Sequence, residues 1–78
     1  MWVKTQSGRV FNLDVFRSLD IEPKAAGEFD VVARDGNGEG ETLATGSRKF
    51  CERVQKVILG RLARGVGYLD YLSRTRER

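Results

Sequence analysis

The spacing of apolar residues changes at Gly46, and this change constrains the fold more than any other feature of the sequence. Before that point apolar and polar residues alternate, as around Leu19 and Ile21, which is the period of a half-buried strand. After it, apolar residues recur at steps of three and four, the period of a helix that buries one face. We therefore expect a sheet followed by a helix.

Five segments before Gly46 combine this alternation with flanking turn residues, and they are predicted strands: 1–5, 9–13, 18–22, 29–34 and 41–45. Trp2 is expected to anchor the first strand. The run at 35–40 contains Asp-Gly and Asn-Gly, which are favoured in hairpin turns. Asn12 and Asp14 compete for local backbone hydrogen bonds, so a break is expected there. Short connections favour antiparallel neighbours, which predicts an antiparallel meander of about five strands.

A helix is predicted over residues 47–64. Ser47 is a suitable N-cap, and Gly65 is suited to end or kink the helix. Its core-facing stripe is expected to contain Phe50, Cys51, Val54, Val57, Ile58 and Leu62. Arg61 falls inside this stripe, so its side chain either reaches past Leu62 to water or meets a carboxylate of the sheet or of a second subunit.

Four large apolar residues follow the helix: Tyr68, Leu69, Tyr71 and Leu72. They either continue the core or form apolar anchors of an interface, and we favour a dimer contact. The sequence thus predicts a single α+β domain over residues 1–72, with an antiparallel meander of about five strands packed against one C-terminal amphipathic helix. Within it, strands occupy 1–45, the helix 47–64 and an apolar extension 65–72. A frayed basic tail is expected at 73–78.

Charge is divided unevenly along the chain. The first 46 residues contain five basic and eight acidic residues, whereas the remaining residues contain nine basic and three acidic ones. Four cations of the predicted helix fall within about a quarter of its circumference: Lys49, Arg53, Lys56 and Arg64. This basic face is either solvated or paired with another subunit, binds nucleic acid, or binds an acidic protein.

The sequence offers little for catalysis, and we expect no enzyme. The chain has no histidine, the usual general base near neutral pH. Cys51 falls on the apolar side of the predicted helix, where thiols are usually inert. Asp20 and Glu22 share a strand face as a catalytic pair might, but solvated strands have the same pattern.

Metal and cofactor sites are not expected either. The run at 35–40 resembles the first half of an EF-hand calcium loop, but Gly46 stands where the loop needs a bidentate glutamate. A hairpin tip explains the same residues. The acids of this run would also repel a phosphate. No apolar run suits a signal peptide or a membrane span.

One motif suggests relatives. The residues Trp2-Val3-Lys4-Thr5, Gly8 and Asn12-Leu13 fit the pattern W-[VI]-x-T-x-x-G-x-x-x-N-L, and strand-like residues and a helix follow. In this the chain resembles a group of short uncharacterised bacterial proteins over roughly residues 2–64. The resemblance implies a small antiparallel sheet closed by a C-terminal helix, and it implies no activity.

The interpretation that follows is a small, non-catalytic, cytoplasmic binding or regulatory module that acts through protein–protein contact and self-associates. No small-molecule substrate, cofactor or membrane is expected. Its contact residues would be the apolar anchors Tyr68, Leu69, Tyr71 and Leu72 and the charged residues Lys49, Arg53, Lys56 and Arg64. The alternative is a nucleic-acid-binding protein that uses the basic face together with Arg74, Arg76 and Arg78.

Overall fold

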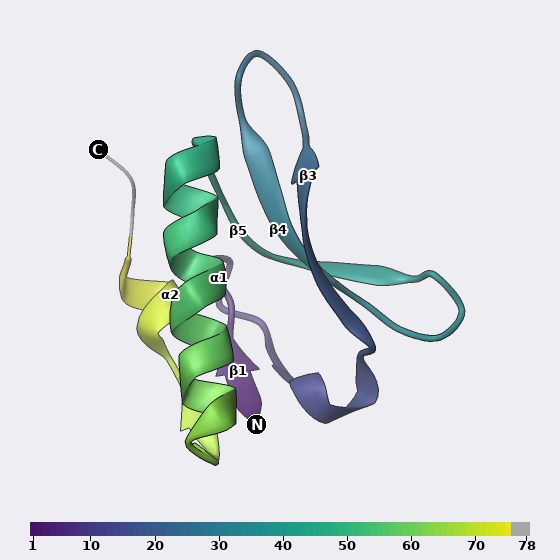
Figure 1. Ribbon diagram of the computed structural model, residues 1–78, viewed down its shortest axis with the longest axis vertical. Helices are drawn as coiled ribbons and strands as arrows, with labels where there is room; N and C mark the ends of the chain where they lie inside the picture. Colours follow the sequence, from purple (N-terminus) through teal and green to yellow (C-terminus); the bar gives the residue numbers. More distant parts are fainter. Residues whose placement is uncertain (76–78) are drawn as a thin grey trace.

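The computed structural model describes residues 1–75, and Figure 1 shows its main helix standing between a short second helix and a pair of long hairpins. In chain order the elements are β1 (Trp2–Lys4), β2 (Val10–Asn12), the 3-10 turn η1 (Leu13–Val15), β3 (Ser18–Pro23), β4 (Phe29–Arg34), β5 (Gly40–Gly46), α1 (Arg48–Ala63), β6 (Tyr68–Leu69) and α2 (Tyr71–Arg74).

The predicted α+β class is confirmed, but the prediction of one continuous meander is wrong. The strands form two separate sheets: sheet A has the order β2-β1-β6, and sheet B has the order β3-β4-β5. The chain leaves sheet A through η1. There the Asn12 side chain accepts the backbone N–H of Asp14 at 3.0 Å, and Leu13 turns into the core. The expected break at these residues is therefore large enough to separate β3 from β2.

The predicted position of the helix at the C-terminal end is also wrong, because the extension after α1 belongs to the fold. β6 pairs with β1 in parallel, with Leu69 beside Val3. Next to this pair, the Trp2 N–H donates to the Gly67 carbonyl at 2.8 Å. Parallel neighbours need a long crossover connection, and here it includes β2, η1, all of sheet B and α1. The last strand of the fold is thus placed beside the first.

The tail was predicted to be frayed from Ser73 onward. This prediction is wrong for its first two residues, Ser73 and Arg74. α2 includes Ser73 and Arg74, and the Ser73 N–H donates to the Asp70 carbonyl at 3.1 Å. Arg74 also forms an ion pair with the Asp70 carboxylate at 2.8 Å. The rest of the predicted tail, residues 76–78, lies outside the described residues.

Most of the predicted helical stripe is buried. The Ser47 side chain accepts the Phe50 N–H at 3.2 Å, which confirms the predicted N-cap. The buried helical residues are Phe50, Cys51, Val54 and Ile58. The expectation for Leu62 is wrong, because its exposed fraction is 39%. The buried stripe is narrower than predicted, and Leu62 lies at its edge.

Both sheets contribute to the same core. Val3 and Leu69 come from sheet A, and Val31, Ala33 and Leu43 come from sheet B; all five join the cluster that contains the buried face of α1. Leu72 of α2 is fully buried in this cluster. One core therefore holds two sheets together.

We expect Leu72→Ala to lower the free energy of unfolding by about 2 to 5 kcal/mol, because the substitution leaves a cavity in a close-packed core. Chemical denaturation monitored by circular dichroism measures this change. Val15→Ala is the control, since 65% of the Val15 side chain is exposed, and it should cost about 0.5 kcal/mol or less. Equal costs for the two variants would show that α2 is not part of the core.

Candidate functional site

The four predicted apolar anchors do not share one surface. Leu69 and Leu72 lie in the core with exposed fractions of 3% and 0%. Tyr71 is half-buried and packs against the same core. Tyr68 alone among the four has a largely exposed side chain. The sequence left open that these residues continue the core, and for the two leucines the structure agrees with that alternative. Leu69 and Leu72 therefore cannot be surface anchors in this fold.

The four predicted contact cations are all exposed: Lys49, Arg53 and Lys56 of α1, and Arg64, which caps the C-terminal end of this helix. None of them forms an ion pair within residues 1–75. The first three line an open hollow of about 500 Å3, together with Glu52 and Gln55. The Arg53 guanidinium also lies over the Phe50 ring, 5.8 Å from its centroid. A carboxylate therefore lies among the cations of this basic face, and Glu52 itself is 3.5 Å from Arg48.

Two further residues of α1 bear on this face. Gly60 has open space around it, because a Cβ built there would meet nothing within 4 Å. Arg61 is half-buried and has no ion pair within the described part of the chain. The sequence allowed Arg61 either to reach water past Leu62 or to pair with a carboxylate. Pairing with a carboxylate of its own sheet is not seen in this part of the chain.

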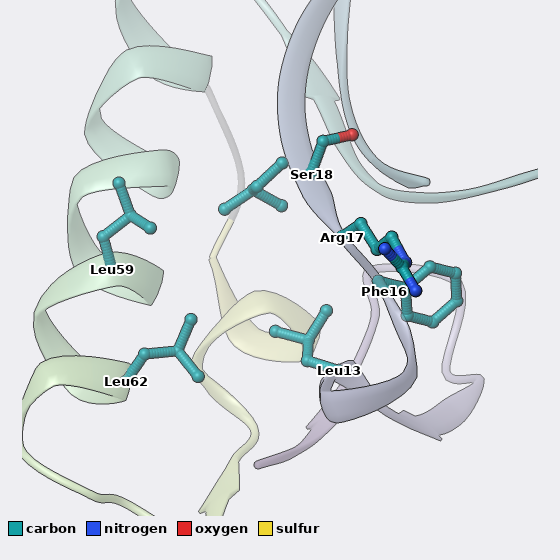
Figure 2. Close-up of a pocket in the computed structure, with 7 residues that line it drawn as sticks. Leu13, Phe16, Arg17, Ser18, Leu59 and Leu62 are labelled. Atoms are coloured by element: carbon teal, nitrogen blue, oxygen red, sulfur yellow. The ribbon is translucent and has the colours of Figure 1, made fainter. Parts of the chain in front are cut away.

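An apolar groove runs between α1 and the segment that joins the two sheets. It encloses about 180 Å3 and is lined by Leu13, Phe16, Arg17, Ser18, Leu19, Leu59 and Leu62. Figure 2 shows Leu62 extending from α1 toward the segment that carries Leu13, with Leu59 above it on the same helix. The exposed fraction of Leu59 is 50%. Apolar side chains thus line both walls and remain in contact with water.

Two contacts hold the walls of this groove in place: a hydrogen bond between α1 and β3, and an aromatic pair that includes Phe16. The Gln55 side chain donates to the Leu19 carbonyl at 2.8 Å, which ties α1 to β3. Phe16 packs edge-to-face on Phe11, with ring centroids 5.2 Å apart. Sequence analysis missed the groove because Leu59 falls outside the predicted stripe and Leu62 was expected inside the core.

A second apolar surface lies on the outer side of sheet A. Trp2 is the register partner of Asn12 on one side and of Tyr68 on the other, and Lys4 is the partner of Val10. Register partners share a face of a sheet, and alternate residues of a strand share it too. These five residues therefore form one face, which we call the aromatic face.

Three side chains of the aromatic face are about half exposed, namely Trp2 at 50%, Val10 at 53% and Tyr68 at 52%. The residues that follow Trp2 and Tyr68 on their strands, Val3 and Leu69, point into the core. Trp2, predicted as the anchor of the first strand, therefore lies on the outer face of sheet A, and the buried residue of that strand is Val3. No local pattern could have placed Trp2 beside Tyr68, because that pairing depends on the parallel contact between β1 and β6.

The groups considered for catalysis or metal binding have other partners in the fold. Cys51 is buried, and its Sγ donates to the Phe29 carbonyl at 3.4 Å. Asp35 accepts the N–H groups of Asn37 and Glu39 at 2.8 and 3.1 Å, which explains this acid as part of a hairpin turn. Within residues 1–75 the structure assembles no cluster of three or more Cys, Asp or Glu side chains that could hold a metal ion.

Glu22 of the considered acid pair is bound by Arg34. The Arg34 Nε donates to one carboxylate oxygen at 2.7 Å, and its Nη2 donates to the other at 2.6 Å. These hydrogen bonds lower the pKa of Glu22 below its ordinary value, and the positive charge of Arg34 adds to the effect. Asp20, its neighbour on the same face, instead accepts the Ser18 hydroxyl at 2.8 Å.

A lowered pKa in the folded state means that ionised Glu22 stabilises the fold. This contribution is present above the pKa of the unfolded chain and is lost as the pH falls through the lower pKa of the folded state. We therefore expect Glu22→Gln to make the acid-side loss of stability less steep. Chemical denaturation at a series of acidic pH values measures it. Arg34→Gln should have the same effect, and a wild-type slope in both variants would contradict the role of this pair.

The chain matches no protein-family model, and no curated protein or solved structure matches it significantly. Within residues 1–75, no helix has both the length and the apolar character needed to cross a membrane.

Proposed function

We propose that the protein is a small non-catalytic binding module that acts through protein contact, and that a second copy of the chain occupies the apolar groove. The observation that carries the proposal is the pair of half-exposed leucines, Leu59 and Leu62, facing apolar side chains across an open groove. Exposed apolar surface of this kind marks sites of association. Packing the groove against its copy would remove Leu59 from water.

Charge supports a second copy as the occupant. Lys56 of α1 and Asp20 of β3 form no ion pair within residues 1–75. Asp20 lies on the face of β3 opposite to the groove residue Leu19, and among the described residues the one charged side chain that lines the groove is Arg17. In a two-fold arrangement α1 of one copy can face β3 of the other. The basic helix and the acidic front half of the chain then attract each other across the interface.

The small size of the domain supports the same proposal. A chain of 78 residues has little core to balance the entropy lost on folding, and an interface adds buried apolar surface. Cytoplasmic residence is part of the proposal as well. It rests on the single cysteine, a buried thiol that suits a reducing compartment.

The alternative assigns nucleic acid to the basic face of α1 and to the tail. It has less support, because Glu52 lies among the cations of the hollow and Arg74 is paired with Asp70. Arg76 and Arg78 lie outside the described residues. The proposal therefore gives the basic face to ion pairing with the second copy.

We expect Leu59→Glu to weaken self-association, because it places a carboxylate in the apolar groove and in the interface. The dissociation constant should rise by about tenfold or more, equivalent to about 1.4 kcal/mol. Sedimentation equilibrium over a range of protein concentrations measures it.

Val10→Glu is the matched control for this experiment. It adds the same charge at an equally exposed apolar residue, on sheet A and away from the groove, so it should leave the dissociation constant unchanged. A wild-type chain that sediments as a monomer at every concentration would contradict the proposal. So would a Leu59→Glu variant that associates as the wild type does.

A further inference from the structure

Trp2 and Tyr68 of the aromatic face stand side by side. Their strands are directly paired, and the two residues are register partners, so their Cα atoms are separated by one strand spacing of about 4.8 Å. Both side chains point away from the core and are about half exposed. Two neighbouring aromatic rings on an open sheet can each offer a π-face to a flat ligand.

The aromatic face also contains two polar residues, Lys4 and Asn12, which can contact a nucleic acid. Lys4 follows Trp2 on the same face and forms no ion pair within residues 1–75. Asn12, on the other side of Trp2, uses its Oδ1 to accept the N-terminal ammonium and the Asp14 N–H. Within residues 1–75 no hydrogen bond is seen from its amide NH2 group, which can therefore donate to a base edge or a phosphate.

The carboxylates nearest to this face in the chain are already neutralised. Asp14 lies 2.7 Å from the N-terminal ammonium of Met1, and Asp70 lies 2.8 Å from Arg74. The chain as a whole has a formal net charge of +3. The two acids closest in sequence to the aromatic face are therefore paired, which leaves the positive charge of Lys4 to attract a phosphate.

From these contacts we infer that the aromatic face is a stacking platform for single-stranded nucleic acid, with Trp2 and Tyr68 each stacking on a base and Lys4 contacting the phosphate backbone. Single strands expose the faces of their bases, and aromatic side chains on sheets are a common way to bind them. Val10 beside Lys4 adds an apolar contact for a base or a sugar.

A protein partner fits this face less well than a nucleic acid does. The centres of protein interfaces are enriched in aromatic residues but depleted of lysine. Here Lys4 lies within the face, next to the aromatic pair. The inference goes beyond the proposed function and does not depend on it, since the groove and the aromatic face share no residue.

The test is a titration of the 78-residue chain, with Met1 as its first residue, using oligodeoxythymidylate and oligouridylate as probes. Trp2 is the only tryptophan in the sequence, so the quenching of its fluorescence reports stacking at this face. We expect saturable quenching by single strands that weakens as salt is raised. Duplex DNA of the same length should bind more weakly, because its bases are already stacked on each other.

Variants assign the binding to the aromatic pair. Tyr68→Ala should weaken binding by roughly 5- to 150-fold, the range expected for loss of one base–aromatic stack. Tyr68→Leu keeps an apolar side chain on β6 and should lose affinity similarly, whereas Tyr68→Phe keeps the ring and should bind as the wild type does. Lys4→Gln should reduce the salt dependence, and Leu59→Glu in the groove should have no effect on the titration.

Any one of the following results would overturn the inference. The first is unchanged Trp2 fluorescence with both oligonucleotides at low salt. The second is wild-type affinity in folded Tyr68→Ala and Tyr68→Leu variants, or binding of the duplex as tight as that of single strands. The third is a Tyr68→Ala variant whose sedimentation mass changes while the wild-type titration stays flat, which would assign the aromatic face to protein contact.

Discussion

The parallel contact between β1 and β6 is the interaction on which the rest of the structure depends. It consists of two register pairs, Trp2 with Tyr68 and Val3 with Leu69, and of the hydrogen bond from Trp2 to the Gly67 carbonyl. Each pair has a different consequence. The second pair places two buried side chains in the core, and the first places two aromatic side chains on the surface.

This contact also determines which residues of the main helix are buried and which are exposed. After α1 the chain returns to sheet A. The buried side of the helix then packs against the two sheets and the segment after α1, and its opposite side faces water. A narrow stripe around Phe50, Val54 and Ile58 then suffices for the core. Leu59 and Leu62 are left at the margin of that stripe, where they line the groove, and the cations of the basic face point outward.

The parts of the fold that could be predicted are those specified by local signals. The helix, its N-cap at Ser47 and the hairpin at Asp35 follow from spacing, capping and turn chemistry within a few residues. The division into two sheets could not be predicted, because the side chains of Asn12 and Asp14 indicate a break but not its angle. The pairing of β6 with β1 was equally inaccessible, since it joins opposite ends of the chain and β6 has only two residues.

The same distinction applies to the candidate sites. The exposure of Lys49, Arg53, Lys56 and Arg64 could be anticipated from the helical wheel. The burial of residues in the apolar extension could not be anticipated, because a pattern of four large residues does not indicate which of them point into the core. Tyr68 and Leu69 are adjacent in sequence yet lie on opposite faces of sheet A. Only the pairing with β1 decides which one is buried.

Amide hydrogen exchange at Trp2 tests this account most directly. The Trp2 N–H is bonded to the Gly67 carbonyl only if the chain after α1 docks on sheet A. The account predicts that this amide exchanges slowly, at a rate close to that of the Val54 amide in the centre of α1. Exchange at the rate of an unstructured chain, while the Val54 amide stays protected, would contradict it.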